Sequence, residues 1–453
     1  MAYSSTKGRK PMESASKTNH SLIIRNPVVQ DFLAACAIPR PPDSDAVATE
    51  AVPVPIPERN PIRVIIAIDG GMTEVPVQVK YPTSSYTFFN FGGLLFQSSD
   101  LEALHAKPFI EPEDMAKLRN IQRFQFVLPT VNLVLEGCGS LIDSVRWSIF
   151  DFFCRAHDGE KPLINALSWF LFQEYDPTRD GKPWTLASCP SCHEPHIPIP
   201  VNTQRQMACP HCAKPIYLTD VFRLHEAVDN EQGAGGVLGY LLSVLEQMLF
   251  VHLVKTISEL KRSMLSEVLF ILDRPLAFFG QTANMHQPMR RMLNHFADDP
   301  GLCESGSARG IRMVGVEKSG AFVEHSDAIR EHIPAGHALV LGNEYIYRFI
   351  TPGAGDPHAA FGRTSYYGSK AIFKAPDGNL YVMTLPTQEP LLSPTLDDLA
   401  NFPVVAHNIA LLRCHMYENA LVPIALVNQL VSLSDHPSKK ILSAFAKGRL
   451  AHR

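Results

Sequence analysis

Two cysteine pairs place the tightest constraint on how this chain folds. They lie in the segment CPSCHEPHIPIPVNTQRQMACPHC, where two residues separate the cysteines of each pair and sixteen residues separate the pairs. A gap of two residues lets a tight turn aim both thiolates at one ion, and four thiolates complete a tetrahedron around zinc with no position for water. The spacing therefore predicts a structural zinc ribbon whose ligands are Cys189, Cys192, Cys209 and Cys212.

Other interpretations of this segment remain open at this point. The four thiols could be free or form a redox pair, although a redox motif needs only one pair, and three nearby histidines could replace a cysteine: His193, His196 and His211. The ribbon could be a scaffold for an insertion, or it could contact DNA or a protein partner.

Composition narrows the cellular setting. The five other cysteines are scattered through mostly apolar surroundings, which favours a reducing compartment over a secreted disulfide framework. The first twenty residues are polar and lack the apolar stretch of a secretory signal. We therefore expect a cytoplasmic protein. The formal net charge of -4 gives no overall basic field, so any contact with nucleic acid must depend on local patches, bound cations or a partner.

The segment 235–257 is nearly long enough and apolar enough to cross a membrane. It carries Glu246 at its centre, with His252 and Lys255 further along. A central charge costs a spanning helix about 2.5–3.5 kcal/mol. We expect a buried helix of a soluble protein and no membrane contact.

The remaining patterns predict an α/β fold with a mixed sheet. Residues 1–61 are expected to be disordered and to end in a proline-rich linker at 39–61, the folded body to span 62–435 with the zinc ribbon inserted at 180–222, and 436–453 to form a basic tail. Strands are predicted at 62–68, 75–81, 267–273, 310–318 and 337–350, a hairpin at 370–386, and helices at 139–174, 236–262 and 408–435, the last broken at Pro423.

Two aspartates stand where apolar strands are predicted to end. Asp69 follows RVIIAI and precedes two glycines, and Asp273 follows EVLFIL. An Asp-Gly pair is also a common turn signal, so Asp69 alone is weak evidence of a site. Ends of neighbouring strands lie within several ångströms of each other, so the two carboxylates can converge.

Glu246 is the third acidic candidate because its helix is apolar on nearly all faces. A buried carboxylate needs either a cation or a basic partner. Three carboxylates and water suit Mg²⁺ or Mn²⁺, which favours a divalent metal site, and a pair of Glu246 with Lys255 or an arginine is the alternative. Lys318 follows another predicted strand and would steady a phosphate beside such a site, or else be an ordinary surface lysine.

The segment FGRTSYYGSK predicts a loop that contacts DNA. It combines positive charge with aromatic rings on which bases of a single strand could stack. Its candidate residues are Arg363, Tyr366, Tyr367 and Lys370. An ordinary surface loop is the alternative.

The order of these pieces resembles the NurA nuclease family. AIDGG resembles the first motif of that family, LFILDRPL the second, VGVEKSG the third and VPIALVNQLV the C-terminal motif, over roughly residues 62 to 435. The sequence departs from the family pattern at two places: Arg274 and Pro275 follow Asp273 where the family usually has Asp-Gly, and Leu430 stands near the usual histidine or acid, with Asn428 the nearest polar residue.

The resemblance implies an RNase H-like core, a homodimer, cleavage of DNA with Mn²⁺ or Mg²⁺, and association with a hexameric HerA-type translocase. By motif it implies that Asp69 and Asp273 are metal ligands and that Glu246 is the helix glutamate, with Glu259 as its rival. Two bound ions would activate water and shield the phosphate. The glycines after Asp69 would then let metal and DNA approach.

We therefore expect a metal-dependent deoxyribonuclease that acts in DNA-end processing, repair or defence against phage. The alternatives are a non-catalytic zinc-ribbon adaptor with a degenerate nuclease core, which the departure in the C-terminal motif favours, and an enzyme of the same fold that acts on RNA.

Overall fold

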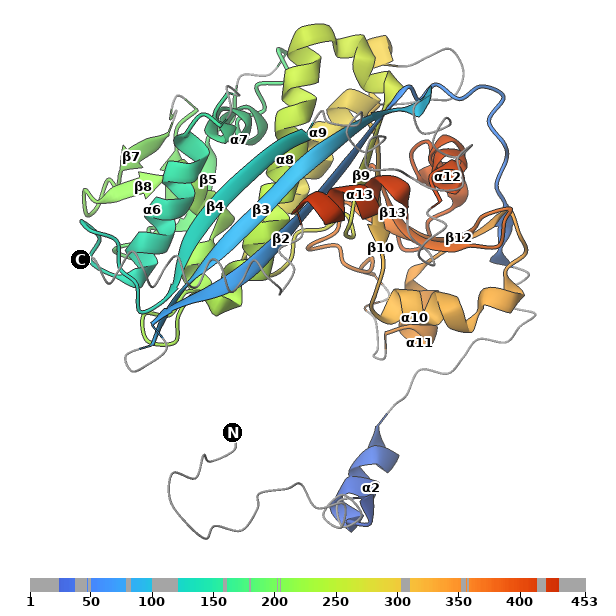
Figure 1. The fold of residues 1–453 in the computed structure, drawn as a ribbon, viewed down its shortest axis with the longest axis horizontal. Coiled ribbons are helices and arrows are strands. Elements are labelled where there is room, and N and C mark those ends of the chain that lie inside the picture. Colours follow the sequence, from blue (N-terminus) through green and yellow to red (C-terminus); the bar gives the residue numbers. More distant parts are fainter. Residues whose placement is uncertain are drawn as a thin grey trace.

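A mixed nine-stranded sheet organises the computed structural model of this chain (Figure 1). The structure describes residues 24–36, 47, 50–78, 83–99, 121–157, 161–178, 181–201, 203, 205–302, 310–351, 356, 358–413 and 421–431. Within them the strand order is β1-β11-β12-β13-β10-β9-β2-β3-β4. These strands span Val52–Pro53 (β1), Val64–Gln78 (β2), Ser84–Gln97 (β3), Ile121–Val131 (β4), Val268–Leu272 (β9), Arg312–Glu317 (β10), His337–Val340 (β11), Gly368–Lys374 (β12) and Leu380–Pro386 (β13).

The centre of the sheet has the arrangement of an RNase H-like core. Strands β2, β3 and β4 are antiparallel neighbours, and β9 and β10 follow on the other side of β2, both parallel to it. Strands β13, β12, β11 and β1 then extend the sheet with antiparallel pairing. The predicted mixed α/β fold is confirmed, and so is the hairpin at 370–386, which forms β12 and β13.

Helices cover both faces of the sheet (Figure 1). Successive residues of β2 point to opposite faces, so Ile66 and Ile68 join the apolar cluster formed with α6 to α9, while Ile65 and Ala67 join the cluster formed with α12 and α13. The helices span Pro27–Ala35 (α2), Leu141–Cys154 (α6), Leu163–Leu171 (α7), Leu238–Lys261 (α8), His286–Ala297 (α9), Ala321–Ala328 (α10), Asn343–Phe349 (α11), Phe402–Leu411 (α12) and Val422–Val431 (α13).

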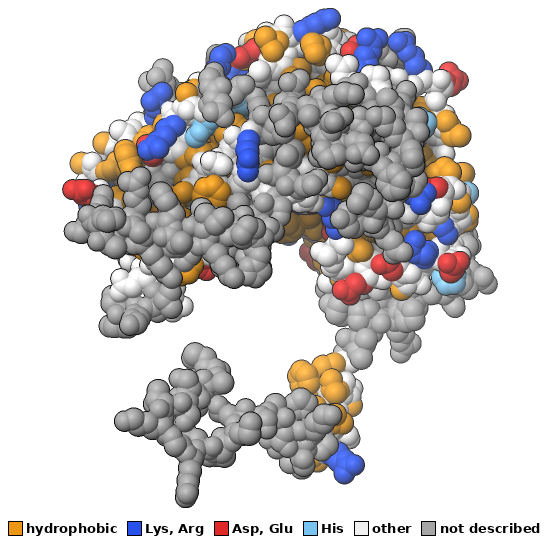
Figure 2. Space-filling view, viewed as in Figure 1, with side chains coloured by type: hydrophobic (Ala, Val, Ile, Leu, Met, Phe, Trp, Pro, Cys, Tyr) orange, Lys and Arg blue, Asp and Glu red, His pale blue; other side chains and the backbone are white. Residues whose placement is uncertain are grey.

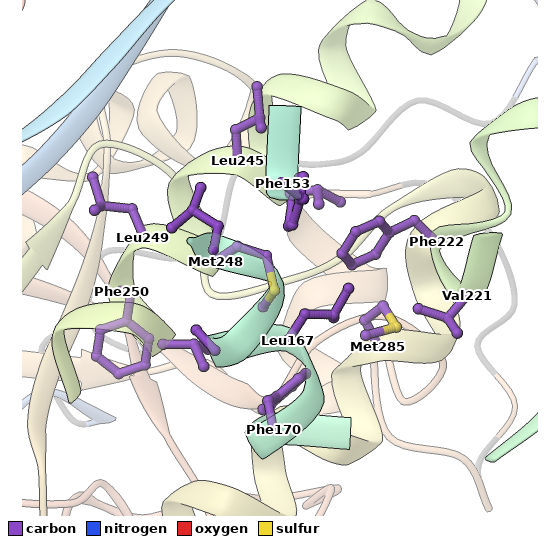
Figure 3. Close-up of a cluster of buried hydrophobic side chains, with 14 of the residues drawn as sticks. Phe153, Leu167, Phe170, Val221, Phe222, Leu245, Met248, Leu249, Phe250 and Met285 are labelled. Carbon is purple, nitrogen blue, oxygen red and sulfur yellow. The ribbon is translucent and has the colours of Figure 1, made fainter. Parts of the chain in front are cut away.

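Helix α8 is the apolar segment that matches a membrane span in length. The helical stretch Gly235–Glu267 is long and apolar enough to cross a membrane, but 78% of its most apolar window is buried inside the protein. Figure 3 shows Leu245, Met248, Leu249 and Phe250 of this helix among side chains of α6, α7 and the segment around residues 221–222. The core therefore accounts for the apolar character of α8.

Strand β2 corrects one prediction. The sequence predicts two strands, at 62–68 and 75–81, with a turn signal at the Asp-Gly-Gly segment between them, but β2 runs through this segment without interruption. Asp69, Gly70 and Gly71 pair in register with Gly92, Phe91 and Asn90 of β3. The long aromatic strand β3 supplies a hydrogen-bonding partner along this whole length, so no turn forms.

The predicted strand 337–350 is also partly wrong. Only β11 is extended there, and helix α11 follows it. In α11 the side chains of Tyr345 and Ile346 are buried, and they join the same apolar cluster as Ile350 one turn later. This spacing suits one face of a helix, and it outweighs the β propensity of the aromatic residues.

The N-terminal part is more ordered than predicted. Asn26 caps α2, none of whose residues is buried, and the helix stands apart from the body in Figure 1. Further along, β1 pairs with β11, Val47 and Ala51 are buried, and Asn60 exchanges hydrogen bonds with Asn408. Residues 50–61 therefore belong to the body. The predicted tail 436–453 lies outside the described residues.

Charged side chains of both signs are interspersed on the face drawn in Figure 2. The outline is hollowed between the part that carries β2, β3 and β4 and the part that carries α10 and α11 (Figures 1 and 2).

Candidate functional site

Asp69 and Asp273 lie side by side on neighbouring parallel strands. Ile68 of β2 is opposite Leu272 of β9, so the two aspartates are the next residues in this register. Strand alternation places Asp69 on the face that α12 and α13 cover. Asp69 is 5% exposed. The sequence correctly brings the two aspartates together, although Asp69 reaches the site from the middle of a strand.

Two polar side chains contact this aspartate pair. Lys318, just after β10, donates a hydrogen bond from Nζ to Oδ2 of Asp273 at 2.7 Å. Asn428 of α13 has its amide oxygen 2.7 Å from Lys318 Nζ and its nitrogen towards Asp69. The opposite amide orientation would put the nitrogen 3.3 Å from Asp273 but turn the oxygen against the Asp69 carboxylate, so we adopt the first. Helix α13, which carries the C-terminal motif, thus contacts Asp69 directly and Asp273 through Lys318.

The electrostatics of Asp69 are unfavourable to its charged form. The pKa of its carboxyl is raised to about 7: burial is the largest cause, the neighbouring Asp273 adds to it, and a backbone hydrogen bond from Gly70 together with Lys318 and Arg274 opposes the rise. A cation between the two carboxylates would relieve this repulsion. Among the described residues, Asp69 and Asp273 thus offer carboxylate oxygens of the kind that a hard divalent ion binds.

Glu246 has a basic partner in this structure. Its fully buried side chain comes from α8, on the other face of β2, and its Oε2 accepts a hydrogen bond from Arg274 Nε in an ion pair. Burial raises the pKa of Glu246, and contact with Arg274 opposes that rise. Arginine stays protonated in proteins, and its guanidinium in direct contact with Oε2 favours the charged carboxylate, so we describe the pair as ionised. The Glu–Arg alternative to metal binding is thus the arrangement seen here.

Gly70 lies where α8 approaches the sheet. A Cβ at this position would be 2.8 Å from both Leu242 Cδ1 and Phe91 Cβ, and 3.0 Å from Glu246 Oε1. The glycine therefore makes room for the helix and its carboxylate, which corrects the interpretation that it clears a path for DNA. Glu246 Oε1 has no hydrogen-bond partner in the described part of the chain.

The four cysteines converge more closely than the three carboxylates. Their sulfur atoms all lie within 4.8 Å of one another. Among the described residues, these four side chains form the group that is close enough together to hold one metal ion. The three carboxylates Asp69, Glu246 and Asp273 do not form such a group there. Glu246 is the member set apart, because it approaches from the opposite face of β2.

Two small hairpins carry the cysteines. They are formed by β5 (Trp184–Ser188) with β6 (Pro195–Ile199), and β7 (Gln206–Ala208) with β8 (Pro215–Tyr217). After each pair the chain turns alike: the amides of His193 and Ala213, both with positive φ, donate to the carbonyls of Cys189 and Cys209. The paired turns give a four-thiolate cluster consistent with a zinc site, and no histidine belongs to it.

Glu259, the rival helix glutamate, lies elsewhere. Its carboxylate is 41% exposed and pairs with Lys255 and with Lys161, at 3.0 Å from the latter. These contacts also remove Lys255 as a partner for Glu246.

Burial of Tyr367 and Lys370 corrects the prediction that the segment FGRTSYYGSK is a DNA-binding loop. Arg363 is exposed, but Tyr367 is fully buried and Lys370, on β12, is 3% exposed. Lys370 pairs with Glu317 and lies over the rings of Phe322 and Tyr366. Burial raises the pKa of Tyr366 and of Tyr367, as expected for rings inside the protein. Tyr367 and Lys370 therefore stabilise the fold and cannot present a surface to DNA.

The buried tyrosine supports the site indirectly. Tyr367 donates a hydrogen bond from its hydroxyl to Gln247 Oε1 at 2.9 Å, and Gln247 Nε2 donates to the carbonyl of Ala277 at 3.1 Å. This network joins α8 to the chain just after Arg274. Sequence reasoning missed Gln247, and the only signal for it was a polar residue beside Glu246 in an apolar helix.

Comparisons with known proteins found distant structural likeness. No protein-family model matches the chain, and no curated protein matches it. The chain is similar to the NurA nuclease of Sulfolobus solfataricus at 8% identity with a TM-score of 0.34, covering 97% of this chain and 98% of that one. Two further NurA structures, the second with manganese, are similar at 10% and 11% identity, with TM-scores of 0.30 and 0.28, covering 95% of this chain and 95% and 97% of theirs. At these values the likeness assigns neither a site nor an activity to this chain.

Proposed function

We propose that this chain is a divalent-metal-dependent nuclease that hydrolyses DNA. The observation that carries the proposal is the pair formed by buried Asp69 of β2 and half-buried Asp273, next to it in register just after parallel β9, with Lys318 beside them. The order of the four sequence motifs, which resembles that of NurA nucleases, agrees with it. Mn²⁺ or Mg²⁺ bound there would activate a water and shield the phosphodiester.

The chain's own residues would perform three tasks. Asp69 and Asp273 would hold the ion, and Lys318, as a compact positive charge, would orient a phosphate oxygen near it. Asn428 would fix the Asp69 carboxylate and the Lys318 ammonium relative to each other. Both aspartates must be ionised to bind metal, so metal binding is expected to release a proton from Asp69 near neutral pH.

The wider proposal is a homodimer that acts with a hexameric HerA-type translocase in DNA-end processing, repair or defence against phage. The net charge of -4 and the burial of Tyr367 and Lys370 support it, because they leave this chain poorly equipped to hold DNA alone. A translocase would deliver DNA to the site. We also propose that the four cysteines bind a structural Zn²⁺.

A nuclease assay with matched variants tests the activity. With Mn²⁺, Asp69→Asn and Asp273→Asn should each lose more activity than the roughly 10–100-fold expected for a merely supporting residue of a metal site. Glu259→Gln is the control, since its exposed carboxylate lies away from the aspartates, and it should keep wild-type activity. Cleavage of DNA that persists undiminished in both aspartate variants would refute the proposal, and a comparison with RNA defines the substrate.

A second candidate is a non-catalytic zinc-ribbon adaptor. The ion pair between Glu246 and Arg274 favours it, because one of the three expected acidic ligands is already neutralised. Metal-dependent turnover that disappears in either aspartate variant would eliminate this candidate.

A further inference from the structure

Arg274 pairs with Glu246 and interacts electrostatically with the aspartate pair. Its side chain follows Asp273 directly, its Nε contacts Glu246 Oε2, and its charge also acts on Asp69 and Asp273. Since Glu246 is fully buried, loss of Arg274 would leave an uncompensated charge inside the protein. Glu246 therefore cannot turn to a metal ion without breaking a buried pair.

The backbone that carries Arg274 is fixed on two sides. A Cβ on Gly315 of β10 would lie only 2.3 Å from the carbonyl oxygen of Arg274, so a glycine is needed for the chain to pass there. Two residues later the carbonyl of Leu276 accepts a hydrogen bond from the amide of Tyr367 at 3.1 Å. The position of Arg274 is thus built into the fold.

The charges on the two faces of β2 are balanced differently. Glu246 and Arg274 cancel on the α8 face, whereas on the α13 face two aspartates and Lys318 leave one net negative charge when all are ionised. One divalent ion would change that net charge to a single positive charge, which complements one phosphodiester. A second ion would leave a large positive excess, and the described residues bring no third free carboxylate to the aspartate pair to hold it.

From these contacts we propose that Arg274 is a positioning residue that withdraws Glu246 from metal binding and limits the site to one divalent ion, held by Asp69 and Asp273. The inference rests on the proposed function only in assuming a metal at the aspartates. Glu246 then supports the site by joining α8 to the segment after β9, and Lys318 takes the place of a second cation.

Calorimetric titration of Mn²⁺ into the zinc-loaded full chain tests the number of ions directly. We expect one Mn²⁺ per chain in the wild type and loss of this site in Asp69→Asn and in Asp273→Asn. Glu246→Gln should keep one Mn²⁺ with an affinity reduced by less than about 10-fold, the lower limit for loss of a supporting residue. Two ions in the wild type, or loss of Mn²⁺ binding in a Glu246→Gln protein that melts like the wild type, would overturn the inference.

Variants of Arg274 provide the converse test. Arg274→Met should free Glu246 and add a second Mn²⁺ or tighten the first, while the double variant Glu246→Gln/Arg274→Met, which buries no lone charge, should return to one. If Arg274→Met does not fold, the double variant and Glu246→Gln still decide the question, because a loss of the single Mn²⁺ in both would contradict the inference. One bound Mn²⁺ without DNA cleavage would refute the proposed nuclease activity and leave the one-ion inference standing. Two bound Mn²⁺ with DNA cleavage would refute the one-ion inference and leave the proposed activity standing.

Discussion

At the scale of single residues, Asp69 is the most informative side chain. It is buried next to Asp273 in a strand that continues past it, and its neighbours Lys318 and Arg274 only partly offset the cost of its charge. A structural carboxylate is usually paired well enough to lower its pKa, as Asp377 is by its backbone hydrogen bond from Asn379 and its contact with Arg413. The pKa of Asp69 is raised instead, as expected of a functional carboxylate whose negative charge a bound cation would balance.

The stability of the metal-free protein should therefore depend on Asp69 and pH. The folded pKa of about 7 lies above the ordinary value of 3.8, so the protonated carboxyl is favoured in the folded state. This contribution is fully present below about pH 4 and is lost as the pH rises towards 7. Urea unfolding of zinc-loaded protein without Mn²⁺ or Mg²⁺ should find Asp69→Asn more stable than wild type at pH 8, by about 2–4 kcal/mol, with the difference vanishing near pH 4.

A surface aspartate supplies the control for this measurement. The backbone amides of Gln232 and Glu231 lower the pKa of Asp229, so Asp229→Asn should lose stability relative to wild type as the pH rises, with the opposite sign. A stability difference between Asp69→Asn and wild type that stays constant from pH 4 to pH 8 would show that Asp69 is not buried against a like charge.

Sequence could predict the aspartate pair because both residues follow apolar runs, and neighbouring strands align such positions. It could not predict the partner of Glu246, because that depends on how α8 crosses the sheet. Nor could it predict that Tyr367 and Lys370 are buried: a segment rich in glycine, serine and charge has the composition of a surface loop, and only the pairing of β12 between β11 and β13 takes it inside.

At the scale of elements, the hairpins β5 to β8 are tied to the main body through apolar side chains. Leu186, Ile197, Ile199 and Ile216 belong to the same buried cluster as α6, α7 and α8. The buried pair of Arg146 and Asp220, at 2.8 Å, adds a polar link between α6 and the segment after β8. The four-cysteine cluster is therefore tied to the main body as well as to its own hairpins.

Loss of one cysteine should destabilise the whole chain. Apparent zinc-binding energies of small zinc modules are about 10 kcal/mol or more, so Cys209→Ser should cost at least about 2 kcal/mol of unfolding free energy. Metal analysis should find one zinc per wild-type chain and little in the variant, and thermal melting should shift downwards. Cys36→Ser, at the C-cap of the exposed helix α2, is the matched control and should change neither quantity. Full zinc content in Cys209→Ser would exclude the four-thiolate site.

The elements that sequence predicted well are those with strong local signals. Helix α8, strands β9 and β10, and the hairpin β12–β13 appear close to their expected positions. The sequence predicts two strands in place of β2 because an Asp-Gly-Gly segment normally forms a turn. Only pairing with β3 along the whole length of β2 keeps this segment extended. Strand β3 has no strict alternation, since both its faces are largely buried, which hides it from a search for period two. Strand β4 was missed although exposed Arg123 and Gln125 alternate with buried Phe124 and Phe126.

At the scale of the whole molecule, the sheet joins parts that are distant in sequence. Strand β13 pairs with β10 and so attaches β12, β11 and β1 to the RNase H-like centre. Such long-range pairings leave no local sequence signal, which explains why the proline-rich stretch was expected to be a linker. In the structure this stretch closes one edge of the sheet, and its residues Val47 and Ala51 pack with α10 and α11.

Two truncations measure separately what helix α2 and the edge strand β1 contribute to stability. Removal of residues 1–36 takes away α2, which buries no residue, and should change the free energy of unfolding by less than about 0.5 kcal/mol. Removal of residues 1–61 also takes away Val47, Ala51, the pairing of β1 with β11 and the contact of Asn60 with Asn408, and it should cost about 2–4 kcal/mol. Urea unfolding of both proteins measures the difference. Equal stability of the two would mean that residues 37–61 add no stability to the body, and that the pairing of β1 with β11 does not hold the edge of the sheet.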